Sequence, residues 1–130
     1  MRGRPASGRK EVKLAAQIAV ALVALLQVYF MVLEMFLWDR PLGRRTFRLT
    51  PEFAAASKSL AANQGLYNGF LAAGLAWGLW LGDAGTGVTL FFLACVMIAG
   101  VFGAATVNRR ILAVQGLPGA IALVLTWLSA

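Results

Sequence analysis

Residues 14–38 read LAAQIAVALVALLQVYFMVLEMFLW, and this stretch decides the class of fold. Its apolar run is interrupted only by Gln17, Gln27 and Glu34. Because roughly 20 helical residues cross the hydrocarbon core of a bilayer, a run of about 25 residues is long enough to span it. The run is too long for the apolar region of a signal peptide, and no A-x-A-like cleavage site ends it. We therefore predict an uncleaved transmembrane helix.

The composition of the whole chain indicates the same class of protein. The 130 residues are 60% hydrophobic and 13% charged, with a mean hydropathy of +0.75. Soluble domains are on average about half apolar and about a quarter charged. The chain has 12 Lys and Arg against 5 Asp and Glu, a net charge of +7. A membrane surface explains this basicity better than nucleic acid does, so we expect no nucleic-acid partner.

Three further apolar stretches follow the first one, after a polar segment from Asp39 to Leu60. Within that segment, Thr50-Pro51-Glu52 predicts a helix start, with Thr as N-cap, Pro in the first turn and an acid at the positive end of the helix dipole. We expect this helix to continue into the second span. The predicted spans are 14–38, 61–81, 88–107 and 111–128, and Pro118 is expected to kink the last of them.

The expected fold is therefore an all-α membrane protein, a four-transmembrane-helix bundle with a basic first loop whose helix continues into span two. Residues 14–130 form its single transmembrane domain. Residues 1–13 are a basic tail, which their composition predicts to be disordered. Gly65 and Gly69 are predicted to pack closely against a neighbouring helix. We expect a multi-pass protein of the cell inner (plasma) membrane that forms a homo-oligomer.

Polar side chains gather toward the end of the spans that carries the basic loop. They close span one, open span two, close span three and open span four, and they are Glu34, Asn63, Gln64, Tyr67, Asn68, Asn108 and Gln115. Polar groups in lipid cost free energy unless they face a partner or a wet cavity. We therefore predict one polar cluster in one leaflet, rimmed by arginines that include Arg109 and Arg110, as the candidate ligand-binding site.

Each part of this cluster has two interpretations. Glu34 either pairs with Arg109 or Arg110 or takes part in ligand or proton binding. Asn63, Gln64 and Asn68 either join helices by hydrogen bonds or line a pocket. The arginines of the first loop bind either anionic lipid headgroups in general or one specific anion.

Some kinds of chemistry are excluded by residue counts. The chain has no His and 1 Cys, which rules out disulfide frameworks, His-based metal sites and Cys/His nucleophiles. Cys95 lacks the electropositive surroundings that make a reactive thiolate, so we interpret it as apolar filler. We predict neither a metal nor a cofactor.

Several specific motifs lie between Glu34 and Phe70. The runs are Leu33 to Trp38, Thr46 to Glu52, and Leu60 to Phe70, which reads LAANQGLYNGF. Together with Gln115-Gly116-x-Pro118, they resemble the bacterial family known as domain of unknown function 1304, over Leu14 to Leu128. The resemblance implies a small four-span membrane protein, and the family brings no assigned activity.

A more distant likeness is to the eicosanoid and glutathione membrane-enzyme superfamily, which has four spans and a basic first loop. Arg45 to Phe47 and Pro51-Glu52 are similar to its first-loop motif, and Asn63 falls where that superfamily has an Asn. Its neighbouring Arg, His and Glu are replaced here by Ser59, Ala61 and Leu66. The likeness implies a trimeric bundle, whereas the replacements argue against glutathione chemistry.

Three functions are compatible with these residues. The one we favour is a membrane protein whose polar cluster binds a lipid headgroup or a small amphiphile, with Arg109 and Arg110 as anion partners. The second is a small proton-coupled exporter that uses Glu34, although Glu34 lies only one turn from Trp38. The third is a membrane enzyme of glutathione- or lipid-conjugating type, with Tyr67 as proton donor and Glu34 as base. No motif compels a reaction, so the sequence favours binding over catalysis.

Overall fold

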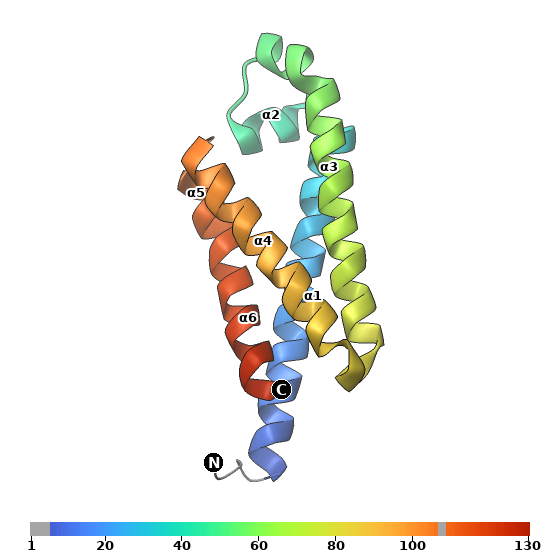
Figure 1. Ribbon diagram of the computed structural model, residues 1–130. Helices are drawn as coiled ribbons and strands as arrows, with labels where there is room; N and C mark the ends of the chain where they lie inside the picture. Colours follow the sequence, from blue (N-terminus) through green and yellow to red (C-terminus); the bar gives the residue numbers. More distant parts are fainter. Residues whose placement is uncertain (1–5, 107–108) are drawn as a thin grey trace. The chain divides into compact units, whose positions relative to one another are not determined.

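Helices make up nearly all of the computed structural model, which describes residues 6–106 and 109–130 (Figure 1). The longer helices are α1 (Ala6–Phe36), α3 (Pro51–Trp80), α4 (Thr86–Thr106) and α6 (Leu117–Ser129). Between them lie α2 (Pro41–Phe47), the 3₁₀ turn η1 (Gly82–Gly85), α5 (Arg109–Ile111) and the π-helical turn η2 (Leu112–Gly116). The described residues contain no strand, so the predicted all-α class is confirmed.

Two stretches are long and apolar enough to cross a membrane, by length and composition alone. They are Ser7–Phe36 in α1 and Gly82–Thr106, which contains α4. Ala113–Ser129 is apolar but shorter than a full span. α3 has the length of a span, but polar residues such as Asn63, Gln64 and Asn68 lower the hydropathy of its middle. The described residues of the four predicted spans are thus largely helical, and two helical stretches pass the test of length and hydropathy for a membrane span.

α1 begins earlier than the sequence predicts. It starts at Ala6, so residues 6–13 of the expected disordered tail are helical. Lys, Arg and Glu are good helix formers, and this segment carries Arg9, Lys10, Glu11 and Lys13. Extending an existing helix adds one hydrogen bond for each residue fixed, without a new nucleation step. The disorder predicted for this part of the tail is therefore wrong, while residues 1–5 lie outside the described residues.

α3 begins where the Thr-Pro-Glu motif predicts. The backbone N–H of Phe53 donates to Thr50 Oγ1 at 3.2 Å, and the N–H of Ala54 donates to the Thr50 carbonyl at 2.9 Å. Thr50 therefore satisfies donors that the first turn of a helix leaves without intrahelical partners. From Pro51 the helix runs unbroken to Trp80, so the prediction of a continuous helix from the loop into the second apolar stretch is confirmed.

α2 lies in the segment expected to be a polar loop, and the sequence analysis did not predict it. Pro41 stands in its first turn, where the missing N–H and fixed φ of proline cost nothing. The helix ends at Arg48, which has a left-handed φ of 56° and donates its backbone N–H to the Arg44 carbonyl. The Arg40-Pro41 step was the sequence signal for this helix.

The helices divide between two compact units, and α1 and α3 contribute to both. Unit 2 is Leu25–Ala72, which holds the end of α1, all of α2 and most of α3. On α3 the buried residues recur every three or four positions, at Ala61, Gly65, Asn68 and Ala72. This spacing forms one stripe along the helix. The stripe consists of small residues with a single amide among them.

Unit 1 comprises Ala73–Ala130 and the chain up to Ala24. α4 packs against α6 and η2, as Figure 1 shows, and buries Leu93 and Val96 completely. A Cβ added to Gly78 of α3 would collide with Thr89 of α4. Between the second and third predicted spans lies the 3₁₀ turn η1, in which Gly82 has a positive φ of 64° that favours glycine.

Pro118 was expected to kink the last predicted span, and the structure has a π-helical turn directly before it. Proline lacks an N–H, and its ring crowds the carbonyl four residues earlier, here that of Val114. The helix widens into the π-helical turn η2 over Leu112–Gly116, directly before α6. A Cβ on Gly100 of α4 would lie 3.3 Å from the Gly116 nitrogen, so α4 and η2 pack with their backbones close together.

Candidate functional site

The buried polar centre of unit 2 is a hydrogen bond between Glu34 of α1 and Asn68 of α3. Asn68 Nδ2 donates to Glu34 Oε1 at 2.6 Å, and only 4% of Glu34 and 9% of Asn68 are exposed. Gln27 lies two helical turns before Glu34 and is fully buried, so the two share the buried face of α1. Within unit 2 the carboxyl group therefore has a neutral amide as its partner.

α1 and α3 approach closely beside this hydrogen bond because Gly65 and Gly69 face α1. A Cβ on Gly65 would lie 3.0 Å from Glu34 Cβ and 3.1 Å from the Met31 carbonyl oxygen. A Cβ on Gly69 would lie 2.7 Å from Met31 Sδ. Small residues allow helix backbones to come this near in membranes. The close approach brings the short Asn68 side chain within reach of Glu34.

The other polar residues that the sequence places on α3 lie on its exposed face. Asn63, Gln64 and Tyr67 are all exposed, and the Tyr67 ring contacts Phe70 edge-on with the ring centres 5.8 Å apart. Unit 2 therefore separates the residues that were expected to converge. Glu34 and Asn68 meet in the interior, while the other three face outward, toward lipid, a ligand or another protein.

The remaining predicted site residues do not belong to unit 2. Arg109 and Arg110 are exposed on α5, and Gln115 is buried in η2. All three are part of unit 1. Asn108 lies outside the described residues.

α2 is firmly attached to the ends of α1 and α3. The rings of Trp38 and Phe47 lie with their centres 4.9 Å apart, and Trp38 Nε1 donates to Ser57 Oγ at 3.0 Å. Gly43 packs on the backbone where α1 ends, and a Cβ there would collide with the carbonyl oxygen of Leu37. The loop that the sequence describes only as polar is thus a fixed platform.

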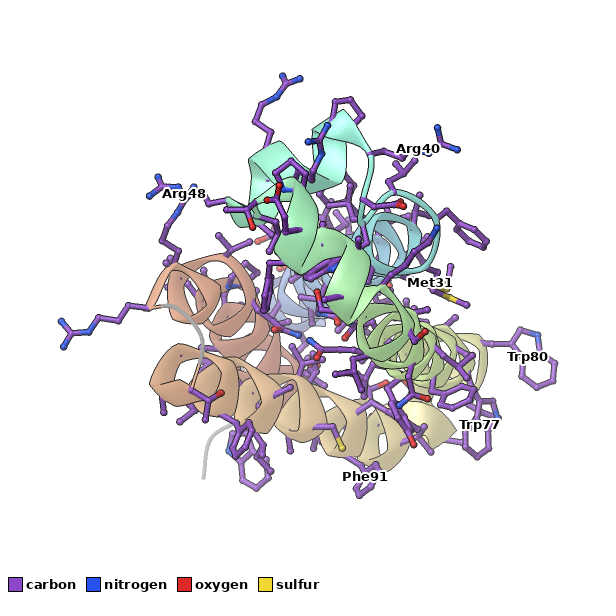
Figure 2. The ribbon with its side chains drawn as sticks, turned by 90° about the horizontal axis from the view of Figure 1, so that it is seen from above. Met31, Arg40, Arg48, Trp77, Trp80 and Phe91 are labelled. Atoms are coloured by element: carbon purple, nitrogen blue, oxygen red, sulfur yellow. The ribbon has the colours of Figure 1, made fainter. Side chains whose placement is uncertain are left out.

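This platform presents four arginines, Arg40, Arg44, Arg45 and Arg48. Figure 2 shows Arg40 and Arg48 extending away from the ribbon. The ion pairs in the described part of the chain are Lys58 with Asp39, at 3.1 Å, and Lys13 with Asp83. The four arginines of the platform therefore pair with none of its acids. In addition, the buried Nε of Arg44 finds no hydrogen-bond partner among the described residues.

The charge balance at this end of unit 2 is positive. The hydrogen bond from Lys58 holds the pKa of the Asp39 carboxyl below its ordinary value, so this acid is ionised and already paired. Glu52 is exposed in the first turn of α3, where the helix dipole favours an acid. What the α2 platform can do chemically is bind an anion by charge-assisted hydrogen bonds.

The chain is similar to proteins whose function is not known. It matches the family described as Protein of unknown function (DUF1304) over residues 21–127. An uncharacterized protein, YpaA, of Lactococcus lactis subsp. lactis (strain IL1403) is 31% identical over 97 residues, which are 73% of this chain and 82% of YpaA. No solved structure matches the chain significantly. The matched family region includes both Glu34 and Asn68, and all of the α2 platform.

Proposed function

We propose that this chain, which belongs to the DUF1304 family of proteins of unknown function, is a multi-pass membrane protein that binds anionic lipid headgroups. In this proposal four spans cross the inner (plasma) membrane, and the α2 platform lies at the lipid–water interface. The single observation that carries the binding function is a cluster of four arginines, two in one short, fixed helix and one at each of its ends, without acidic partners among the described residues.

Exposed apolar surface supports the membrane location. In the most apolar window of Ser7–Phe36 only 28% is buried inside the structure, and in that of Gly82–Thr106 only 22%. A core helix of a soluble protein would be mostly buried, so these helices need an apolar solvent. Trp77, Trp80 and Phe91 also extend outward from the ribbon in Figure 2. Lipid is the solvent that such a surface requires.

We include α3 and α6 among the proposed spans for two reasons. The last 20 residues of α3, from Ala61 to Trp80, carry no charged side chain. The π-helical turn before α6 keeps the backbone helical through the region of Pro118, as a chain inside a bilayer requires. Four spans place the two ends of the chain on the same side of the membrane.

The α2 platform supports headgroup binding by both charge and geometry. Each Arg near an anionic leaflet contributes about 1 kcal/mol of attraction. Arg44 adds a partly buried guanidinium whose Nε is still without a partner in the described structure. The planar guanidinium matches the oxygen atoms of a phosphate group in a two-point contact. The platform thus combines a general attraction with one position suited to a specific contact.

The outward polar face of α3 supports a homo-oligomer. Asn63, Gln64 and Tyr67 are exposed, and amides facing lipid cost free energy unless they meet a partner. A second copy of the chain offers the same polar groups in return. We expect native mass spectrometry with lipids retained to detect an oligomer, and we expect Asn63→Leu to weaken it. A monomer under all lipid conditions would contradict this part of the proposal.

The headgroup proposal is tested by measuring which lipids remain on the purified protein. We expect anionic phospholipids to be enriched over the bulk membrane, and Arg44→Gln with Arg45→Gln to remove most of that enrichment. Arg2→Gln with Arg4→Gln is the matched control, because it removes two positive charges near the start of the sequence and leaves α2 unchanged. If the control variant loses the anionic lipid and the α2 variant keeps it, the assignment to α2 is wrong. Equal retention of phosphatidylcholine and anionic phospholipid would remove the headgroup proposal altogether.

The membrane location has its own test. Cysteine labelling at Asp83 and at Arg45 in intact cells is expected to report opposite sides of the membrane. Labelling of both positions from the same side would contradict the four-span arrangement, whatever the protein binds.

A further inference from the structure

A small polar cavity lies inside unit 1. Its volume is about 50 Å³, enough for a few water molecules or a polar group of three or four non-hydrogen atoms. The uncharged polar side chains that line it come from α1, α4 and α6, and they are Gln17, Thr86, Thr89, Thr126 and Ser129. The charged side chains of Lys13 and Asp83 also line it. Only 4% of Thr89 and 6% of Thr126 are exposed. We call this space the hydroxyl cavity.

The hydroxyls of Thr86 and Ser129 offer acceptors rather than donors to the hydroxyl cavity. The Thr86 hydroxyl donates to the Asp83 carbonyl at 3.2 Å, and the Ser129 hydroxyl donates to the Thr126 carbonyl at 2.9 Å. With their protons committed, these two oxygens can only accept. Thr126 Oγ1 is buried and has no hydrogen-bond partner in the described structure. Since a buried hydroxyl without a partner is unfavourable, the cavity fits a group that brings N–H or O–H donors.

A larger recess adjoins the hydroxyl cavity and is basic. Its volume is about 490 Å³. The two spaces share four lining residues, Lys13, Asp83, Thr86 and Ser129. The recess adds Arg9 and Lys10, so three cations face one carboxylate. Such a surface is suited to a phosphate group.

An exposed ion pair stands between the recess and the cavity. Lys13 Nζ contacts Asp83 Oδ1, and the side chains are 44% and 85% exposed. Exposed ion pairs contribute little to stability, so this one opens readily. A ligand that carries one positive and one negative group can insert between Lys13 and Asp83 and give each a new partner without changing the net charge.

We propose that unit 1 binds the phosphoethanolamine headgroup of a membrane lipid. The phosphate lies in the basic recess against Lys10 and Lys13. The ammonium pairs with Asp83 and enters the hydroxyl cavity, where it donates to the oxygens of Thr86 and Thr126. The ammonium has three N–H donors and a short ethylene link, which matches a small cavity lined with acceptors. A choline group has three methyl groups and no N–H, so it neither fits nor satisfies Thr126.

This site is separate from the α2 platform. The inference takes from the proposed function only that the chain lies in a membrane. The two sites also differ in chemistry, because the platform offers cations alone, whereas this site offers cations, a carboxylate and hydroxyl oxygens. Arg44→Gln is therefore expected to leave ethanolamine-lipid binding unchanged even where it abolishes the anionic enrichment.

The first test uses the wild-type chain and needs no variant. Native mass spectrometry measures retention of phosphatidylethanolamine, its mono- and dimethyl derivatives, and phosphatidylcholine, all with the same acyl chains. Because each methyl group removes one donor, we expect retention to fall at every step, by about tenfold over the series. Equal retention across the series would overturn the proposal. Preferential retention of phosphatidylglycerol by Arg44→Gln/Arg45→Gln, in which the α2 platform no longer enriches anionic lipid, would do so too, because that lipid has no ammonium.

The second test removes the unpartnered hydroxyl. Thr126→Val keeps the volume of the side chain and is expected to lower ethanolamine-lipid retention about fivefold. Thr106→Val is the matched control, since the Thr106 hydroxyl donates to the Phe102 carbonyl and does not line the cavity. Unchanged retention in Thr126→Val would show that the hydroxyl cavity does not take the ammonium group.

A soluble headgroup distinguishes a lipid from a free phosphate ester. Glycerophosphoethanolamine carries the same polar groups without acyl chains. We expect it to displace the lipid only at concentrations at least about a hundredfold higher, because it buries no apolar surface. Displacement at equal concentration would overturn the lipid assignment and identify a free phosphate ester as the ligand.

Discussion

Two buried polar groups of this protein, Asn68 in unit 2 and Thr126 in unit 1, differ in their hydrogen bonding. In unit 2 the amide of Asn68 donates to Glu34 at 2.6 Å, so two buried polar groups satisfy each other. In unit 1 the Thr126 hydroxyl is buried beside a cavity of about 50 Å³ without a partner among the described residues. Both units use glycines to bring helices together, Gly65 in one and Gly78 in the other.

The difference separates structural polar groups from candidate binding groups. Where two buried polar groups at a close helix contact hydrogen-bond to each other, the bonded atoms are not open to a ligand. Removing one group leaves the other buried without its partner, which costs free energy. A close contact that leaves a cavity and an unsatisfied hydroxyl keeps a position open. Burial alone does not distinguish the two cases, whereas the pairing of the buried atoms does.

The largest effect is expected from breaking the hydrogen bond of unit 2. Asn68→Leu leaves Glu34 buried without its donor, and we expect it to lower the unfolding free energy by about 3 kcal/mol. The measurement is denaturant unfolding in mixed micelles. The double variant Glu34→Leu/Asn68→Leu, which removes both polar groups, is expected to recover most of the loss. If the double variant is less stable than Asn68→Leu, the pairing does not explain the burial.

The second-largest loss of stability is expected for Gly65→Ala, and it should exceed the loss for Gly69→Ala. Gly65→Ala places a Cβ 3.0 Å from Glu34 Cβ and 3.1 Å from a backbone carbonyl, which cannot move away easily. We expect a loss of about 2 kcal/mol. Gly69→Ala meets only the flexible sulfur of Met31, so we expect less than about 1 kcal/mol from the same unfolding measurement. Equal losses would mean that α1 and α3 move apart as a whole.

In unit 1, removing a buried polar group by Thr126→Val is expected not to lower the unfolding free energy, in contrast to Asn68→Leu in unit 2. An apolar isostere replaces a hydroxyl that has no partner in the described structure, so we expect an unfolding free energy that is unchanged or higher by up to about 1 kcal/mol. The measurement is the melting temperature in detergent without added lipid. A clear loss of stability would show that the hydroxyl makes a hydrogen bond that the structure lacks.

The smallest effect is expected at the exposed pair of Asp39 and Lys58. Because Lys58 lowers the pKa of Asp39 in the folded protein, this pair adds stability above the ordinary pKa of the carboxyl. That stability is lost as the pH falls through the lowered value. The melting temperatures of wild type and Asp39→Asn should therefore differ slightly at about pH 7 and converge once the pH is below the lowered pKa of Asp39. A difference that grows at low pH would contradict this sign.

Much of the helical architecture could be predicted from local chemistry. Thr50 and Pro51 determine where α3 begins, because the cap and the proline act within one turn. Pro118 accounts for the departure from α-helical geometry in the turn before it, because proline lacks an N–H and crowds the carbonyl four residues earlier. The start of α1 was predicted too late, because composition suggested disorder where good helix formers extend an existing helix to Ala6. α2 was missed although the Arg40-Pro41 step indicates it.

The candidate site could be predicted only in part. Helical spacing puts Gln27 and Glu34, which are seven residues apart, on one face of α1, and both are buried in the structure. The same spacing puts Asn63, Gln64, Tyr67 and Asn68 within one arc of α3, yet the first three are exposed and Asn68 alone is buried. An arc of about 140° is wider than the strip that one neighbouring helix covers. Spacing therefore identifies a face but not which of its residues reaches the partner.

The sequence by itself determined that this chain is basic, apolar and helical. It also located the ends of α3 and the proline-dependent irregularity in the last span. These features depend on residues that are neighbours along the chain, whose interactions do not require knowledge of the fold. Tertiary structure alone decided that Asn68 meets Glu34, that four arginines stand on or beside a fixed helix, and that Thr126 faces a cavity beside Lys13 and Asp83. The Asn68–Glu34 hydrogen bond and the lining of the cavity join residues far apart in sequence, and both depend on where glycines allow helices to touch.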